Sequence, residues 1–229
     1  MNTVPFSSSS IQFLIDLTQN NNREWFTKHK DEYLIAQENA GEFIDNLIVL
    51  MNKHDQLVNE SGKKSLFRIY KDVRFSKDKT PYNPRFACGL NRSEKFRRGG
   101  YYVNLQPGKS AIACGFFAPN TADLLRIRKD IEANYKTWER LLESKEIKEN
   151  FGAMKGDSVK TAPRGFEKDH PAIHLIRHKQ FLFSHEFTDK EVLDDQFVVK
   201  MDSIFQAIRP FFDYMSTVLT TNMDGEDAG

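Results

Sequence analysis

The chain is poor in cysteine and has no long apolar run. Its 229 residues include two cysteines, too few for the disulfide framework of a small secreted domain. The longest apolar runs, 47–51 and 111–118, are far shorter than the roughly 18 residues that a membrane-spanning helix needs. The first ten residues have neither the basic start nor the apolar stretch of a signal peptide. We therefore expect a cytoplasmic protein without a membrane partner.

The sequence also lacks the short motifs of well-known enzyme classes. It has no glycine-rich loop of the P-loop or dinucleotide-binding type, so no cofactor is implied. Cys88 and Cys114 lie in no Cys-x-x-Cys pattern, and we expect both to be small core residues. His170, His174 and His178 recur at every fourth position, but no carboxylate nearby completes a ligand set, so these histidines are not predicted to form a metal site.

The near-zero net charge hides an uneven distribution. The chain has 33 Lys and Arg against 32 Asp and Glu, a formal net charge of +1. Residues 60–100 contain twelve basic and four acidic residues, a net charge of +8. Residues 189–229 contain three basic and nine acidic residues, a net charge of −6. This distribution excludes a protein that is basic all over, but permits a concentrated cationic site; alternatively, the two segments neutralise each other in the fold.

Apolar residues recur with helical spacing in several segments. A short helix capped by Ser10 is predicted to end near Asn20, and a long helix is predicted to follow over 23–53. Further helices are predicted over 122–134, 136–148 and 194–219.

Residues 67–75 instead alternate between apolar and polar side chains, the pattern of a half-buried strand. Phe67, Ile69, Val73 and Phe75 are expected on its apolar face, and Arg68, Tyr70, Asp72 and Arg74 on its ionic face. Strands are also predicted over 86–90, 101–106, 110–118 and 179–187.

These elements favour an α+β fold. A tight turn at residues 107–108 joins two predicted strands as a hairpin, so the central sheet is expected to be mostly antiparallel. Helices near the N- and C-terminal ends of the chain are expected to flank this sheet. We predict a single domain over residues 1–221, followed by a disordered acidic tail, residues 222–229.

The densest ionic segment is 68–85. Arginine binds carboxylate or phosphate through two parallel hydrogen bonds, and lysine acts as a mobile point charge. The predicted substrate-binding residues of this segment are Arg68, Tyr70, Arg74, Lys77, Lys79 and Tyr82. Asp72 and Asp78 are candidate catalytic residues, as acid, base or contact to a divalent cation. The alternative is an ion-pair network that stiffens a long loop.

A second ionic segment, 158–171, is shaped by Pro and Gly. Lys160 and Arg164 are predicted substrate-binding residues here, and His170 is a third candidate catalytic residue. His170 and Pro171 are expected to open a short helix that runs to His178, and a helix N-terminus favours anions. The alternative is a surface loop with solvated charges.

Three motifs of the chain resemble those of a widespread family of bacterial and fungal proteins that contain a domain of unknown function. The motifs cover residues 20–26 (NNNREWF), 67–82 (FRIYKDVRFSKDKTPY) and 160–171 (KTAPRGFEKDHP). The resemblance covers about residues 11–214 and implies a single domain, but no activity. Arginine is usual in that family where this chain has Lys71.

Charged and aromatic residues dominate the motifs, which packing alone rarely requires. We therefore expect the three motifs to converge on one anion-binding cleft, which would suit an enzyme that acts on a phosphorylated or nucleotide-like substrate. One alternative is a nucleic-acid-binding module that uses the basic segment 60–100. The other is a structural scaffold whose charges pair internally or with an acidic partner.

Overall fold

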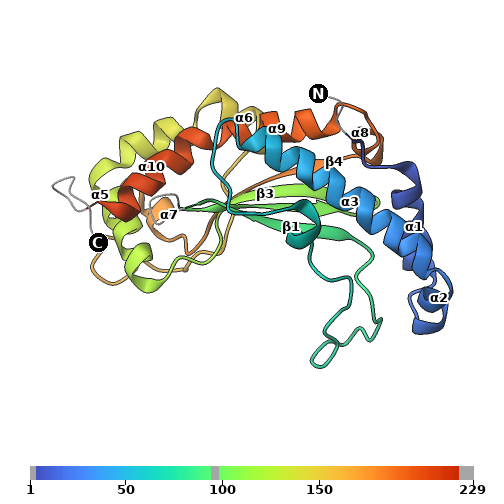
Figure 1. Ribbon diagram of the computed structural model, residues 1–229. Coiled ribbons are helices and arrows are strands. Elements are labelled where there is room, and N and C mark those ends of the chain that lie inside the picture. Colours follow the sequence, from blue (N-terminus) through green and yellow to red (C-terminus); the bar gives the residue numbers. More distant parts are fainter. Residues whose placement is uncertain (1–3, 94–97, 222–229) are drawn as a thin grey trace. The chain divides into compact units, whose positions relative to one another are not determined.

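The structure, a computed structural model, describes residues 4–93 and 98–221 (Figure 1). Four strands form one antiparallel sheet in the order β1-β2-β3-β4. These strands are β1 (Phe86–Asn91), β2 (Gly100–Leu105), β3 (Ser110–Phe116) and β4 (Phe181–Phe187). The α+β class is thus confirmed, and these four strands begin and end within about two residues of their predicted bounds. No described helix is long and apolar enough to cross a membrane.

The chain divides into two compact units. Unit 1 comprises Met1–Leu90, Tyr102–Ile112 and Glu186–Ser203, and unit 2 comprises Asn91–Tyr101, Ala113–His185 and Ile204–Gly229. Each of the four strands has residues in both units. That the chain is a single domain stays a prediction, and the tail at 222–229 lies outside the described residues.

Unit 1 packs its helices around an aromatic core. Its elements are α1 (Ser8–Gln19), α2 (Arg23–Lys28), α3 (Lys30–Met51), α4 (Gly62–Ser65), α8 (Asp189–Val192) and the first part of α9 (Phe197–Ala207). The buried ring of Phe43 in α3 contacts Phe6, and it stacks on Phe197 with 5.6 Å between ring centroids. Phe6 also packs against Phe86 of β1, which joins α3 to the sheet.

Two helix boundaries in unit 1 differ from the predictions. The N-cap of α1 is Ser7 rather than Ser10, because the Ser10 N–H donates to Ser7 Oγ at 3.1 Å. The long helix predicted over 23–53 is broken at His29, which has φ −108° and ψ 25° and separates α2 from α3. No glycine or proline marks this break, so the sequence pattern alone does not reveal it.

Unit 2 contains α5 (Thr121–Leu142), α6 (Lys145–Phe151), α7 (Ile173–Ile176), α10 (Arg209–Thr220) and the end of α9. Its core centres on Trp138 of α5, whose buried ring contacts Phe181 of β4 and Phe211 of α10. The helix predicted to end at 134 continues through a kink at Asn134 to Leu142. The helix predicted over 194–219 is instead divided into α9 and α10, because Pro210 has no N–H to continue the first helix.

The strand predicted over 67–75 is wrong. The segment makes only isolated bridges, Leu66 to Cys88 and Tyr70 to Tyr82, and of the predicted apolar face Ile69 alone is buried. The carboxylates of Asp72 and Asp78 accept hydrogen bonds from backbone N–H groups two residues further on, at 3.2 and 2.9 Å. Such local turns compete with strand pairing, which explains why the alternating pattern does not form a ladder here.

Candidate functional site

Residues 66–85 of unit 1 form an irregular hairpin, which we call the basic hairpin. Three backbone hydrogen bonds hold its arms: Phe67 N–H to Ala87 O at 2.8 Å, Asn83 N–H to Ile69 O at 2.7 Å, and Lys71 N–H to Pro81 O at 2.9 Å. In Figure 1 this segment (teal) follows α4 and projects away from α3 before it returns to β1. Backbone hydrogen bonds therefore hold the hairpin up to Lys71 and Pro81, while none of residues 72–80 is buried.

The first motif holds the second through the side chains of Asn21 and Phe26. Asn21 Oδ1 accepts a hydrogen bond from the Tyr82 N–H at 3.1 Å, and Asn21 Nδ2 donates to the Tyr82 carbonyl at 2.9 Å. The ring of Phe26 stacks on Tyr82, with 4.0 Å between centroids and 17° between ring planes. Asn22 has a different role, because its side chain caps α2 by accepting from the Trp25 N–H. Residues 20–26 thus anchor the returning arm of the hairpin.

Both acidic residues of the hairpin are engaged by cations. Arg74 donates to both carboxylate oxygens of Asp72, at 3.0 and 2.7 Å, and this bonding lowers the pKa of the Asp72 carboxyl. Lys71, followed by the Thr80 N–H and hydroxyl, lowers the pKa of the Asp78 carboxyl. Both carboxylates are therefore ionised at neutral pH and already accept hydrogen bonds. Their catalytic role stays a prediction.

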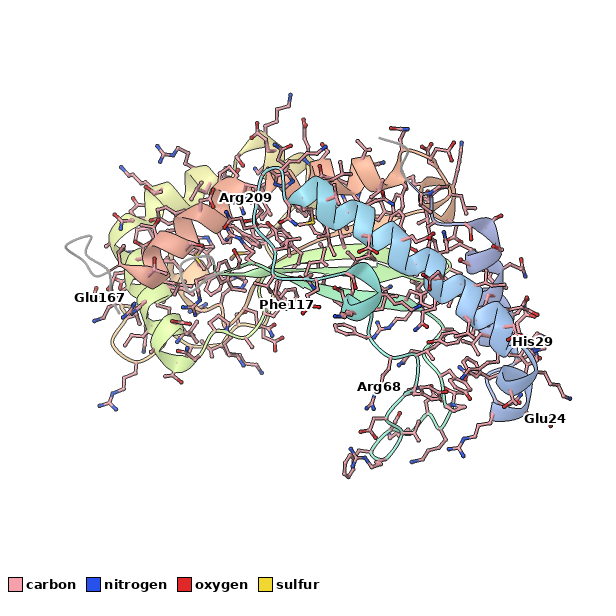
Figure 2. All side chains as sticks on the ribbon, in the orientation of Figure 1. Glu24, His29, Arg68, Phe117, Glu167 and Arg209 are labelled. Atoms are coloured by element: carbon pink, nitrogen blue, oxygen red, sulfur yellow. The ribbon has the colours of Figure 1, made fainter. Side chains whose placement is uncertain are left out.

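Several cations near this segment form no ion pair with a carboxylate among the described residues, although Arg68 also helps to lower the pKa of the Asp72 carboxyl. They are Arg23, Arg68, Lys77, Lys79 and Arg85, of which Lys79 donates to the Val73 carbonyl at 3.0 Å and Arg85 to Asn104 Oδ1 at 3.3 Å. Figure 2 shows the Arg68 side chain pointing outward from the hairpin. The hairpin carries six basic and two acidic residues, so its net charge is +4.

The same hairpin exposes aromatic rings. Phe67 is 54% exposed, Tyr70 50% and Phe75 96%. The Arg74 guanidinium lies over the Phe75 ring, 6.0 Å from its centroid. The sequence pattern placed Phe67 and Phe75 on a buried face; the two prolines at 81 and 84, which cannot donate to a ladder, are the signal against that interpretation.

Other basic residues of the +8 segment are used internally. Lys63 and Lys64 pair with Glu38 and Glu60 in unit 1. In unit 2, the Arg92 side chain is 1% exposed and bonds Asp213, a residue of the −6 segment, at 3.2 Å. Arg98 pairs with Asp123. The two oppositely charged segments thus neutralise each other in part, and within residues 60–100 most of the described cations without an ion pair lie in the basic hairpin.

The third motif lies in unit 2. Lys160 and Arg164 are exposed, and neither has a carboxylate partner among the described residues. The predicted helix over 171–178 is shorter than expected: α7 begins at Ile173, and the Ala172 N–H before it donates to His170 Nδ1 at 3.1 Å. A four-residue helix provides no strong dipole. The structure brings the first two motifs together within unit 1; convergence of all three on one cleft stays a prediction.

The described histidine and cysteine side chains show neither a metal site nor a reactive thiol. Among residues 4–93 and 98–221, no group of three or more His, Cys, Asp or Glu side chains is placed to hold a metal ion. Cys88 and Cys114 are both buried, as predicted, and burial raises the pKa of the Cys88 thiol to about 12. Burial also raises the pKa of Cys114. Neither thiol is suited to act as a nucleophile at neutral pH.

Comparison with known proteins agrees with the resemblance of the three motifs. A family model described as a conserved hypothetical protein, DUF2461, matches residues 9–214. No curated protein and no solved structure matches the chain. The matched range includes the basic hairpin, the anchoring residues 20–26 and the third motif. The chain therefore belongs to the DUF2461 family of conserved hypothetical proteins.

Proposed function

We propose that the basic hairpin binds single-stranded nucleic acid, with its cations on the phosphates and its exposed rings stacked on bases. The observation that carries the proposal is Phe75, which is 96% exposed within a cationic segment. Leaving a phenylalanine in water forgoes roughly 2 kcal/mol of burial free energy, so a ring held outward in this way is typical of an interaction site.

The surroundings of Phe75 fit this kind of ligand. Proteins that bind single strands combine a cationic track with aromatic platforms, because every base has a face that can stack. Arg68, Lys77 and Lys79 supply cations that form no ion pair with a described carboxylate, and Phe67 and Tyr70 supply further rings. A duplex hides its base faces in the stack, so the exposed rings favour single strands over double strands.

The exposure of the hairpin argues against an enclosed cleft for a small anion. Sites for small molecules bury most of the ligand surface, whereas the Arg74 side chain is 77% exposed. In the proposed function, Asp72 and Asp78 position Arg74 and Lys71 and take no part in proton transfer. Lys160, Arg164 and His170 lie in unit 2, and the proposal does not require them.

The test measures affinity by fluorescence anisotropy with a labelled oligothymidylate, at low salt and then along a salt series. We expect Phe75→Ala to weaken binding by about tenfold or more, since one base–aromatic stack contributes roughly 1–3 kcal/mol. Phe117→Ala is the matched control, because Phe117 is also exposed but belongs to unit 2 (Figure 2). We expect this control to bind like the wild type.

The salt series tests the cations separately. Each lost phosphate contact lowers the slope of log affinity against log salt by about 0.7 for single strands, so Arg68→Ala with Lys77→Ala lowers it by about 1.4. Absence of binding at low salt, or wild-type affinity of Phe75→Ala, refutes the proposal. Displacement of the oligonucleotide by a mononucleotide at a lower concentration than by unlabelled oligonucleotide favours a small phosphorylated ligand instead.

A further inference from the structure

Unit 2 contains a pocket between α5 and α10, which lie side by side in Figure 1. Its volume is ≈ 600 Å³, within the roughly 300–1,000 Å³ range of small-molecule sites. The lining residues recur at steps of three and four along each helix, so each helix contributes one face. The lining consists of Arg126, Lys129, Asp130, Ala133, Asn134 and Thr137 from α5, and of Tyr214, Thr217, Val218 and Thr221 from α10 and its C-cap.

One wall of the pocket is fixed by Asp130. Its Oδ2 accepts from Tyr214 Oη and from Trp138 Nε1, both at 2.7 Å, and its Oδ1 accepts from Asn134 Nδ2 at 2.8 Å. Burial, followed by the hydrogen bond to Asp130, raises the pKa of Tyr214, so its hydroxyl stays protonated. Three neutral donors thus hold the carboxylate, which leaves it rigid and little able to capture a cation.

The kink of α5 lies at this wall. Asn134 has φ −122° and ψ 30° inside an otherwise helical segment, and its side chain is bonded to Asp130 one turn before it. Helix kinks have local causes and are common beside functional sites. Between the helices, Ala133 and Val218 present short apolar side chains, which explains why the space between two packed helices stays open.

The charges around the pocket are unbalanced. Arg126 donates to the Leu219 carbonyl at 3.1 Å through one nitrogen, which leaves its other donors available, and Lys129 is exposed. No described carboxylate forms an ion pair with either cation, and the one carboxylate of the lining is held by neutral donors. The lining therefore has two cations, one anion and two short apolar side chains, Ala133 and Val218.

We propose that this pocket binds a small organic anion with an apolar body, such as an aromatic carboxylate or phosphate. Lys129 and Arg126 bind the anionic group, because a hydrogen bond between a cation and an anion is stronger than one between neutral groups. Ala133 and Val218 contact the apolar body, and the Asp130 wall limits its depth. All residues that line the pocket belong to unit 2. A negative result for this pocket therefore does not affect the nucleic-acid proposal, and the reverse is also true.

The test uses the Trp138 indole as a reporter, because its N–H bonds Asp130 at the wall. The chain has two tryptophans, so Trp25→Phe leaves a single indole N–H resonance in the NMR spectrum of the full-length protein. Benzoate and phenyl phosphate are titrated, with benzamide as the neutral probe of similar shape. We expect a saturable shift of the Trp138 resonance with one or both anions, and binding of benzamide at least about tenfold weaker.

Two variants locate the ligand. Ala133→Leu extends a lining side chain into the pocket and keeps a good helix former, so we expect it to abolish the shift. Lys129→Gln removes one cation and is expected to weaken binding about tenfold. Lys136→Gln is the matched control, since Lys136 is an exposed cation of α5 outside the lining, and it should bind like the parent protein. If neither anion shifts the resonance, or if the shift survives unchanged in both pocket variants, the proposal is overturned.

Discussion

Asn21 offers the sharpest test of how the basic hairpin is held. Asn21→Ala removes both hydrogen bonds to Tyr82, at 3.1 and 2.9 Å, and leaves a backbone N–H and carbonyl of a buried residue without that partner. A net hydrogen bond contributes about 1 kcal/mol, and an unsatisfied buried group costs about 1–3 kcal/mol. We therefore expect the free energy of unfolding to fall by about 2–3 kcal/mol.

Urea unfolding measures this change, because a lower midpoint at an unchanged slope reports a loss of stability. Hydrogen exchange then shows where the loss is felt, and faster exchange should concentrate in residues 69–83. Asn46→Ala is the matched control: its side chain donates only to Glu42 O, within its own helix, so its effect should stay within about 0.5 kcal/mol. Equal midpoints for Asn21→Ala and the wild type would refute the anchoring role of Asn21.

A second variant tests which atom donates and which accepts in the two hydrogen bonds between Asn21 and Tyr82. Asn21→Asp keeps an acceptor for the Tyr82 N–H, but at neutral pH it places a carboxylate against the Tyr82 carbonyl. The fold then favours the protonated carboxyl, which restores a donor, so the pKa of this group is expected to rise above the unfolded value of about 3.9. Stability relative to the wild type should recover as the pH falls through this raised pKa.

Three further predictions concern packing, pH and thiol reactivity. Gly62→Ala places a Cβ 2.0 Å from the Gly41 carbonyl oxygen, so α3 and α4 must separate. Calorimetry should show that the free energy of unfolding falls by at least about 2 kcal/mol. In Gly108→Ala the new Cβ has nothing within 4 Å, but the backbone has φ +68°, so the free energy of unfolding should fall by only about 1 kcal/mol. The Lys200 ammonium and the Thr188 N–H lower the pKa of Glu191 from 4.5 to about 2, so this stabilisation is present above pH 4.5 and is lost as the pH falls through about 2. Denaturation across that range should show a difference between wild type and Glu191→Gln that disappears in acid, and a difference independent of pH contradicts the ion pair. Cys88 and Cys114 should react with iodoacetamide in urea but not in buffer, as followed by mass spectrometry, and rapid labelling of the folded protein contradicts their burial.

The sheet and most helices could be predicted from local sequence pattern. A strand or helix that buries one face has apolar residues at the period of its own backbone, and this period is visible in the sequence. The strands β1 to β4 carry apolar residues that face the helices, and the tight turn at residues 107–108 joins β2 to β3 as predicted. The break at His29 and the kink at Asn134 are different in origin. At each position the side chain bonds one turn back, His29 Nδ1 with the Trp25 carbonyl at 2.8 Å and Asn134 Nδ2 with Asp130 Oδ1 at 2.8 Å, and the hydrophobic period of the sequence does not record such bonds.

The basic hairpin shows where periodicity misleads. Its alternation of apolar and ionic residues matches a strand, but alternation records which side chains could share a face, not whether a neighbouring strand is present. Here Asp72 and Asp78 draw their neighbours into local turns, and prolines interrupt the returning arm. The apolar residues of the pattern are then left outside, and Phe75 is the extreme case. An ionic motif with two turn-forming aspartates is better interpreted as a projecting loop.

The net charge of a segment is a similarly incomplete guide to ligand binding. It counts each charged residue but does not show which residues are already paired in the fold. Arg92 and Arg68 contribute equally to the +8 of residues 60–100, yet Arg92 is buried and bonded to Asp213, whereas the Arg68 side chain points outward (Figure 2) and forms no ion pair with a described carboxylate. What makes a cation available to a ligand is the absence of a nearer anion, and that depends on the fold. On this criterion the cationic character of the segment reduces to the basic hairpin, where the unpaired cations and the exposed rings coincide. Their coincidence on one ordered projection, rather than the charge itself, favours a nucleic-acid ligand.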